Sequence, residues 1–220
     1  MKRVVVVGGG ELVHLDLMRI KPEQDFIITA DAGLLPLVEA GITPHLAVGD
    51  FDTLGLDRLT WLKKLGIPFI QLPFEKGMTD LHFAVEEALK VEPDEVVILG
   101  AYGGARIDHA LANIGLLEWI EEQGGKGVIY HHTNRLRLLV APIKIYLNQE
   151  VGYSYVSLLP ISRRVEGITT SGMRYPLQNG VLIRGRTLGI SNELNERTAH
   201  IEIHKGKCLL IESSDHAFNQ

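Results

Sequence analysis

The sequence of 220 residues is short of several features that would place it in other protein classes. Its single cysteine, Cys208, can form neither an intrachain disulfide nor a cysteine metal cluster, so we expect a reducing, cytoplasmic location. No apolar run approaches the roughly 20 residues that a membrane-spanning helix needs, which predicts no membrane association. The apolar run near the N-terminus ends in glycines, and we interpret it as a buried strand rather than a signal peptide.

Basic residues are also in short supply. The chain has 22 Lys and Arg against 27 Asp and Glu, which gives a net charge of -5. Without a basic excess, we do not expect it to bind the phosphate backbone of nucleic acids. Several of the acidic residues stand beside glycines, in expected loops after strands, and these loops are the places to look for a site.

Up to about residue 132, short apolar runs alternate with stretches of helical periodicity. The expected strands are Lys2–Val7, Phe26–Ala30, Leu46–Val48, Pro68–Leu72, Glu95–Leu99 and Gly127–His131. The expected helices are Leu12–Arg19, Leu34–Ala40, Leu56–Leu65, Leu81–Val91 and His109–Gln123. Near-continuous apolar strands separated by helices are typical of a parallel sheet covered on both faces.

After His132 the helical periodicity ends and short alternating segments follow. The expected strands are Arg135–Val140, Tyr153–Leu159, Arg164–Thr169, Gly180–Arg184, Ala199–His204 and Lys207–Glu212. This pattern is typical of a small antiparallel sandwich or barrel. We therefore expect an α/β fold in two domains, with a parallel-sheet, Rossmann-like domain over residues 1–132 and an antiparallel β-sandwich over residues 133–220.

The segment G-D-F-D contains two aspartates at the expected end of a buried strand. Gly49 allows a close turn, and in an extended segment Asp50 and Asp52 point to one side while Phe51 points to the other. Two adjacent carboxylates repel unless a cation lies between them, and oxygen ligands of this kind suit Mg²⁺. An Asx-turn in which Asp52 caps the following helix explains one of the two aspartates, but not both.

Two further acidic segments precede expected helices. Asp31, in A-D-A-G, follows a strand that we expect beside the one that ends near Val48, although a helix cap is the commoner role of such a residue. In F-E-K-G-M-T-D, Thr79 can cap a helix whose first turn contains Asp80. Lys76, next to a glycine, is a cation that could hold a phosphate.

The segment G-G-A-R-I-D-H resembles a phosphate-binding loop that leads into a helix, but its glycines match neither the Walker A motif nor the dinucleotide fingerprint. Arg106, His109 and Asn113 are spaced to share one helix face, with Asp108 beside them. The three glycines at positions 8–10 also suggest a phosphate-binding loop, but they match no specific motif either.

Other candidates have simpler interpretations. Ser191 and Asn192 fit a hairpin turn, and Tyr175 fits packing in the sandwich. The adjacent pair His131 and His132 lacks the spacing of a metal motif, so we interpret both as structural, and Cys208 lies in an apolar strand as a core residue. Carboxylates, glycine turns and cations without a nucleophile indicate phosphoryl-type transfer with a metal.

Taken in order, the motifs A-D-A-G, G-D-F-D-T, E-K-x-x-T-D, G-x-R-x-D-H-x-x-x-N and S-N-E resemble the thiamine pyrophosphokinase (thiamin diphosphokinase) family over nearly the whole chain. The resemblance implies an α/β domain that binds ATP and Mg²⁺, and a β-sandwich that binds thiamine. It also implies a homodimer with its active sites at the subunit interface. The reaction would transfer a diphosphoryl group from ATP to the hydroxyethyl group of thiamine and release AMP.

The resemblance also assigns roles to individual positions. It implies that the catalytic residues are Asp52, Asp80 and Asp108, and that the Mg²⁺ ligands are Asp50, Asp52 and Asp80. It implies that ATP is contacted by Asp31, Gly49, Asp50, Lys76, Thr79, Arg106, His109 and Asn113. It implies that thiamine is contacted by Tyr175, Ser191 and Asn192. One position departs from the family pattern K-D-x-T-D, because Gly77 stands where the family commonly has an aspartate.

Two points stay open at the level of sequence. Either Asp52 or Asp108 could accept the proton of the thiamine hydroxyl. The same residues also fit a Mg²⁺-dependent nucleotide pyrophosphohydrolase, in which water attacks the phosphate, or a non-catalytic nucleotide or thiamine sensor.

Overall fold

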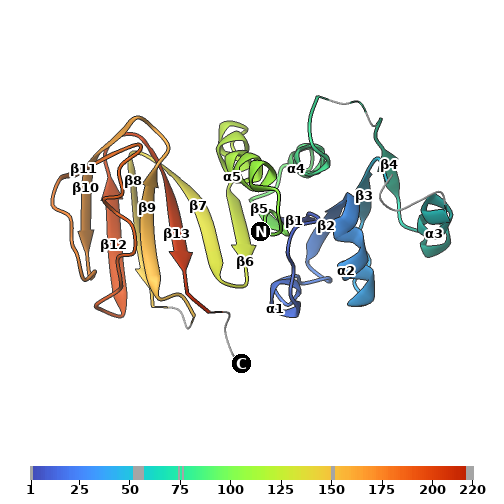
Figure 1. Cartoon of the computed structure of the whole chain (residues 1–220), viewed down its shortest axis with the longest axis horizontal. Helices are drawn as coiled ribbons and strands as arrows, with labels where there is room; N and C mark the ends of the chain where they lie inside the picture. The colour runs from blue at the N-terminus through green and yellow to red at the C-terminus, as the bar shows by residue number, and fades with distance from the viewer. Residues whose placement is uncertain (1, 52–56, 74, 76, 150–151, 217–220) are drawn as a thin grey trace. The chain divides into compact units, whose positions relative to one another are not determined.

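The computed structural model describes residues 2–51, 57–73, 75, 77–149 and 152–216. The chain divides into two compact units, Met1–His132 and Thr133–Gln220 (Figure 1). Among the described residues, no helix combines the length and the apolar character that crossing a bilayer demands.

The first unit contains a parallel sheet. In spatial order its strands are β4 (Phe69–Gln71), β3 (Leu46–Gly49), β2 (Asp25–Ala30), β1 (Arg3–Val7), β5 (Glu95–Leu99) and β6 (Gly127–His131). The chain steps outward from β1 to β4 and then returns to place β5 on the other side of β1. The strand order therefore reverses between β1 and β5, which is the position where open α/β sheets bind ligands.

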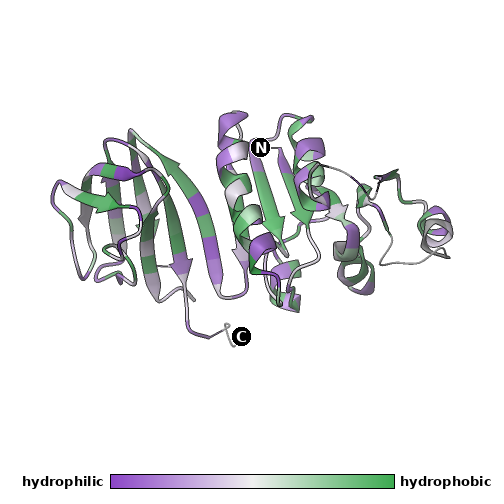
Figure 2. Ribbon diagram, turned by 45° about the horizontal axis from the view of Figure 1, so that its top comes forward, coloured by the Kyte–Doolittle hydropathy of each residue, from purple (hydrophilic) through white to green (hydrophobic). Residues whose placement is uncertain are grey.

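Helices cover both faces of this sheet, as the sequence predicted. They are α1 (His14–Leu17), α2 (Leu34–Glu39), α3 (Asp57–Leu65), α4 (Asp80–Leu89) and α5 (Ile107–Glu122), with a 3-10 turn, η1 (Asp31–Gly33). On one face Val5 and Val7 pack with Leu17 of α1 and Leu37 of α2. On the other face α4 contacts β1 and β2, and α5 contacts β6. The central strands are largely hydrophobic along their length (Figure 2).

The second unit is built from antiparallel strands. One set is β7 (Asn134–Val140), β13 (Lys207–Ser213) and β9 (Tyr155–Pro160), and the other is β11 (Gly180–Ile183), β10 (Arg164–Ser171), β12 (Thr198–Ile203) and β8 (Ile143–Asn148). Side chains from both sets share one apolar core, in which Val165, Ile201 and Leu210 are fully buried. Cys208 is a core residue, as predicted, and burial raises the pKa of its thiol to about 12.

Beyond shifts of a few residues at the ends of other elements, β8 and α1 differ from the sequence prediction. Strand β8 was missed, although Ile143, Ile145 and Leu147 alternate with polar residues and contact the core. Helix α1 ends at Leu17, before the predicted Arg19, and the carbonyl oxygen of Arg19 accepts a hydrogen bond from Nη2 of Arg3 at 2.8 Å. This hydrogen bond therefore joins the segment that follows α1 to strand β1.

Candidate active site

A pocket of 350 Å³ opens where the strand order of the first unit reverses. Its walls come from the loops that follow β1, β2 and β5 and from the first turns of α4 and α5. The predicted site residues that it brings together are Asp31, Thr79, Asp80, Arg106, His109 and Asn113. Residues from three separate motifs thus line one cavity.

The glycine loops after β1 and β5 are held directly against each other. Gly8 N donates to the Leu99 carbonyl at 2.8 Å, and Gly10 N donates to the Gly100 carbonyl at 2.9 Å. A Cβ atom on Gly8 would lie 2.7 Å from the Gly100 oxygen, too close for any side chain. This close approach of two backbones is sufficient to require glycine at position 8.

The carboxyl ends of β2 and β3 bring Asp31 close to the segment that contains Asp50. Ala30 and Val48 are register partners, so Asp31 and Gly49 follow side by side. A Cβ atom on Gly49 would lie 3.2 Å from the Cα of Asp31. Asp31 has a φ of 42°, and strained backbone of this kind gathers at functional sites. Gly49 and Asp50 are not among the residues that line the pocket.

The backbone after Asp50 corrects one detail of the prediction. Phe51 has a φ of 56°, so the backbone at this residue is not extended, whereas the sequence analysis expected it to be; the side on which the Asp52 carboxylate lies is outside the described residues. Phe51 is 3% exposed and packs edge-to-face on Phe69, with ring centroids 6.1 Å apart. Burial of this ring holds the strained turn in place. Asp52 and Lys76, both predicted site residues, lie outside the described residues.

The start of α4 carries two of the predicted residues. Thr79 is the N-cap, and its Oγ1 accepts a hydrogen bond from His82 N at 3.2 Å, which confirms the predicted capping role. Asp80 follows in the first turn, where the helix dipole favours a negative charge. The helix therefore presents a carboxylate to the pocket.

At the start of α5, Arg106 and Asp108 form a bidentate pair. Arg106 Nε donates to Oδ1 of Asp108 at 2.8 Å, and Nη2 donates to Oδ2 at 2.5 Å. The hydrogen bonds from Arg106 hold the pKa of Asp108 well below its usual value. Arg106 lines the pocket, whereas Asp108 is not among the lining residues.

The other two predicted residues of α5 differ in burial. His109 is exposed at the pocket. Asn113 is 7% exposed, and its Nδ2 donates to the carbonyl oxygen of Ala101 at 2.6 Å. Asn113 thus ties α5 to the loop that follows β5 and maintains the shape of the pocket.

Tyr102 also lines this pocket, and the sequence analysis missed it. Its ring stacks on His131 at the end of β6, with centroids 4.8 Å apart. A single aromatic residue after a strand carries no recognisable pattern, so only its place in the fold reveals it.

The second unit has a pocket of its own, with a volume of 330 Å³. Tyr175 and Asn192 line it, and the Tyr175 side chain is exposed. Asn192 Nδ2 donates to the Tyr175 carbonyl at 2.8 Å, while its Oδ1 accepts from Tyr175 N at 3.0 Å. Ser191 does not line the pocket, and its backbone N donates to Oγ of Ser157 at 2.9 Å.

Comparison with known proteins agrees with this division. Residues 17–129 match the family model of the thiamin pyrophosphokinase catalytic domain, and residues 142–208 match that of the thiamin pyrophosphokinase vitamin B1 binding domain. A thiamine pyrophosphokinase from Bacillus subtilis is 32% identical over 211 residues, which cover 96% of this chain and 98% of that protein.

Solved structures give the same result. The crystal structure of thiamine pyrophosphokinase from Bacillus subtilis superposes with a TM-score of 0.89 at 32% identity, covering 98% of this chain and 100% of that one. That of thiamin pyrophosphokinase from Geobacillus thermodenitrificans gives 0.85 at 31% identity, covering 97% and 98%.

The pocket at the strand-order reversal and the two matched domains define the class of protein, a kinase with separate catalytic and vitamin-binding parts. The chain belongs to the thiamin pyrophosphokinase family. This confirms the family expected from the ordered motifs. The enzyme is a thiamine diphosphokinase, which forms thiamine diphosphate with ATP as the donor.

Proposed function

We propose that the 350 Å³ pocket of the first unit binds ATP, and that the chain transfers the diphosphoryl group whole to the hydroxyethyl oxygen of thiamine. The oxygen attacks the β-phosphorus in line, the bond to the α-phosphate oxygen breaks, and AMP leaves. The observation that carries this proposal is the convergence of Asp31, Asp80 and Arg106 on one pocket at the strand-order reversal.

The donor set of this edge of the sheet fits Mg²⁺. Asp31 and Asp80 line the pocket, Asp50 follows beside Asp31, and all three offer carboxylate oxygens, the ligands that Mg²⁺ prefers. We propose Asp50, Asp52 and Asp80 as the metal-holding residues, with Asp31 close by. When bound, Mg²⁺ supplies positive charge to the ATP phosphates.

Other pocket residues act on the nucleotide directly. We propose that Arg106 binds a phosphate through its guanidinium, that Lys76 adds a second cation, and that Thr79, His109 and Asn113 shape the nucleotide side of the pocket. Gly49 leaves room for the close approach of the metal-holding segment to Asp31.

The pairing of Asp108 bears on the identity of the general base. A carboxylate whose pKa is held low by Arg106 is a weak proton acceptor, so Asp108 is better suited to orient Arg106 than to take the hydroxyl proton. We therefore propose that Asp52, the other candidate, accepts the proton of the thiamine hydroxyl.

We propose that thiamine binds in the 330 Å³ pocket of the second unit. We interpret the second unit as a β-sandwich. Thiamine is a cation, and the exposed Tyr175 ring, which has the Arg174 guanidinium over one face at 5.4 Å from the ring centroid, offers its other face for it. Asn192 holds the Tyr175 backbone in place, and Ser191 neighbours it in the same loop.

We also propose a homodimer that works in a reducing cytoplasm. Ile107 and Leu111 are 70% and 64% exposed and lie one turn apart on α5, which supports an apolar contact with a second copy. Sedimentation analysis of the full chain tests this, and Leu111→Glu is expected to shift a dimer toward monomer. A wild-type chain that sediments as a monomer overturns the proposal.

The reaction is tested by incubating the enzyme with ATP and Mg²⁺, with and without thiamine, and by following AMP. AMP that forms only with thiamine, in equal amount to thiamine diphosphate, supports the proposal. AMP without thiamine would indicate hydrolysis, and tight binding without AMP would indicate a sensor. Either of these two outcomes refutes diphosphoryl transfer.

A further inference from the structure

Glu11, His131 and His132 come together at the carboxyl edge of the sheet in the first unit. Glu11 follows the glycine loop after β1, and the two histidines stand at the end of β6. One potential ligand atom from each residue lies within 4.8 Å of the other two. The Glu11 carboxylate is 3.8 Å from Nε2 of His131, and the two imidazole centroids are 3.8 Å apart.

A fourth residue, Asp16, stands behind His132. Its side chain is fully buried, and its Oδ2 lies 3.4 Å from Nδ1 of His132 and accepts a hydrogen bond from Val13 N at 3.0 Å. Its Oδ1 is buried with no hydrogen-bond partner among the described residues. A buried carboxylate with an oxygen that accepts no hydrogen bond lowers the stability of the fold unless a positive charge lies close to it.

Lysine and arginine do not supply that charge. In the described part of the chain, neither Glu11 nor Asp16 forms an ion pair with either residue type, and the titratable groups that face these carboxylates are the two imidazoles. The cluster thus holds two acidic groups and two nitrogen ligands, with the cation to be provided from outside or by protonation of a histidine.

We propose that Glu11, His131 and His132 form a binding site for a divalent transition-metal ion of the Zn²⁺ type. Two imidazoles and one carboxylate are the protein ligands of many zinc sites that leave a fourth position to water. Imidazole favours Zn²⁺ over Mg²⁺, so this site is distinct in chemistry from the all-carboxylate set at Asp50 and Asp80.

The geometry needs only small adjustments. Ligand atoms around tetrahedral zinc lie about 3.4 Å apart when the bonds are close to 2.1 Å. The separation between Glu11 and Nε2 of His131 is 3.8 Å and no separation in the cluster exceeds 4.8 Å, and the Glu11 side chain, 54% exposed, has room to rotate closer. The two imidazoles are already in place, with exposed fractions of 11% and 12%.

Asp16 has the position of an outer-sphere partner. A carboxylate at Nδ1 of His132 keeps the ring proton there and leaves the lone pair on Nε2, as is usual for metal-bound histidines. Tyr102 supports His131 by ring stacking. Both imidazoles are therefore oriented by neighbours before a metal arrives.

The cluster lies outside the parts of the chain that the family models match. Glu11, Asp16, His131 and His132 all fall outside the two matched ranges, 17–129 and 142–208. The proposal is also independent of the ATP reaction. It predicts that the metal ties the loop after β1 to the end of β6.

The test is zinc binding to the full chain, measured by calorimetry and by competition with a chromogenic chelator. The protein is first stripped with EDTA, and Mg²⁺ is kept in large excess to occupy oxygen-ligand sites. We expect one Zn²⁺ per chain and a rise in melting temperature on binding. Replacement with Co²⁺ is expected to give the visible absorption of a four-coordinate site.

The variants Glu11→Gln and His131→Gln are each expected to weaken zinc binding at least tenfold, and Asp16→Asn by about ten- to a hundredfold. Glu11 is exposed enough that its variant keeps the fold, which a melting curve in EDTA verifies. His204→Gln is the matched control, because His204 also faces a carboxylate, Glu202 at 3.2 Å, in the second unit.

Three results would overturn the proposal. The first is wild-type protein that takes up no Zn²⁺ under these conditions. The second is binding that survives both Glu11→Gln and His131→Gln, and the third is binding that is lost in His204→Gln instead. In each case Asp16 and His132 form a structural pair without a metal.

Discussion

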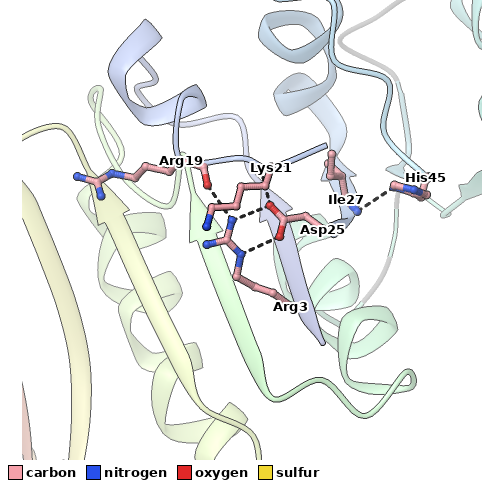
Figure 3. Close-up of polar contacts among 6 residues, drawn as sticks. All are labelled: Arg3, Arg19, Lys21, Asp25, Ile27 and His45. Atoms are coloured by element: carbon pink, nitrogen blue, oxygen red, sulfur yellow. Dashed lines mark hydrogen bonds and ion pairs between the residues drawn. The ribbon is translucent and has the colours of Figure 1, made fainter. Parts of the chain in front are cut away.

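Arg3 and Asp25 face each other at the first positions of the neighbouring strands β1 and β2. Arg3 Nε donates to Oδ1 of Asp25 at 2.8 Å and Nη2 donates to Oδ2 at 2.7 Å, as Figure 3 shows. Lys21 N donates to the same carboxylate at 2.6 Å. The Asp25 side chain is 1% exposed, so this pair closes the amino end of the sheet, opposite the pocket.

Loss of this carboxylate is expected to destabilise the first unit. Asp25→Asn leaves the charge of Arg3 without its partner, and we expect the free energy of unfolding at pH 7 to fall by about 3 kcal/mol. Urea denaturation measures the change. Glu166→Gln, which removes the exposed partner of Arg164, is the control and is expected to leave stability nearly unchanged.

The same pair predicts a pH dependence. Burial alone would raise the pKa of Asp25, but hydrogen bonds from Arg3 and the Lys21 backbone, with the charge of Arg3, lower it below the usual value. Its stabilisation is therefore complete above the unfolded pKa of about 3.9 and is lost as the pH falls through the lower folded value. The gap between wild type and Asp25→Asn should narrow below about pH 4; a constant gap would contradict the pairing.

The carboxylates of the proposed metal set are expected to be needed for turnover but not for folding. Asp80→Asn and Asp52→Asn should each lower kcat by at least about a hundredfold, because the charge that holds Mg²⁺ is reduced. AMP release measures kcat, and circular dichroism checks the fold. Glu86→Gln, on the same helix α4 but outside the pocket, is the control. Near-normal turnover in both Asp variants would refute the metal assignment.

Arg106 and Asp108 are expected to act as one unit. Asp108→Asn releases the guanidinium, so we expect the KM for ATP to rise about tenfold while kcat changes less. Arg106→Gln should raise the same KM, and the double variant should be little worse than Arg106→Gln alone. Steady-state kinetics on the three variants decide this. A large fall in kcat for Asp108→Asn with KM unchanged would instead support a role as general base.

Gly33 is expected to tolerate no side chain. A Cβ atom there would lie 2.3 Å from the Val7 carbonyl oxygen at the end of β1, and backbone cannot move aside cheaply. We expect Gly33→Ala to cost about 2 kcal/mol and to lower the melting temperature by roughly 5 °C. Gly77→Ala is the control, because a Cβ at that position meets nothing within 4 Å. Equal melting temperatures for the two variants would contradict this prediction.

Much of the fold could be predicted because its strands are nearly continuous apolar runs. Val4 to Val7 are all fully buried, and the predicted strands at Glu95–Leu99 and Gly127–His131 match β5 and β6 in both bounds. Strand β8 was missed although its apolar residues alternate with polar ones in the same way as in the second-unit strands that were predicted. Its alternation was a usable signal.

The candidate site could be predicted in part. Asp31, Thr79, Asp80 and Arg106 follow strands or open helices, and the carboxyl ends of parallel strands meet at one edge. The turn at Phe51 could not be predicted, because burial of its ring against Phe69 imposes a backbone conformation that its residue type disfavours.

The sequence by itself determined the alternation of strands and helices, the change near residue 132 from helical periodicity to short alternating segments, and the ordered motifs of the family. These features depend on local periodicity and spacing. Only the tertiary structure decided which loops meet. His131 and His132 do not have the sequence spacing of a metal motif, yet the fold of the sheet brings Glu11 close to them from the N-terminal part of the first unit's sequence. The reason is physical: strand order depends on how all the strands and helices bury their apolar faces together, and no local pattern encodes it.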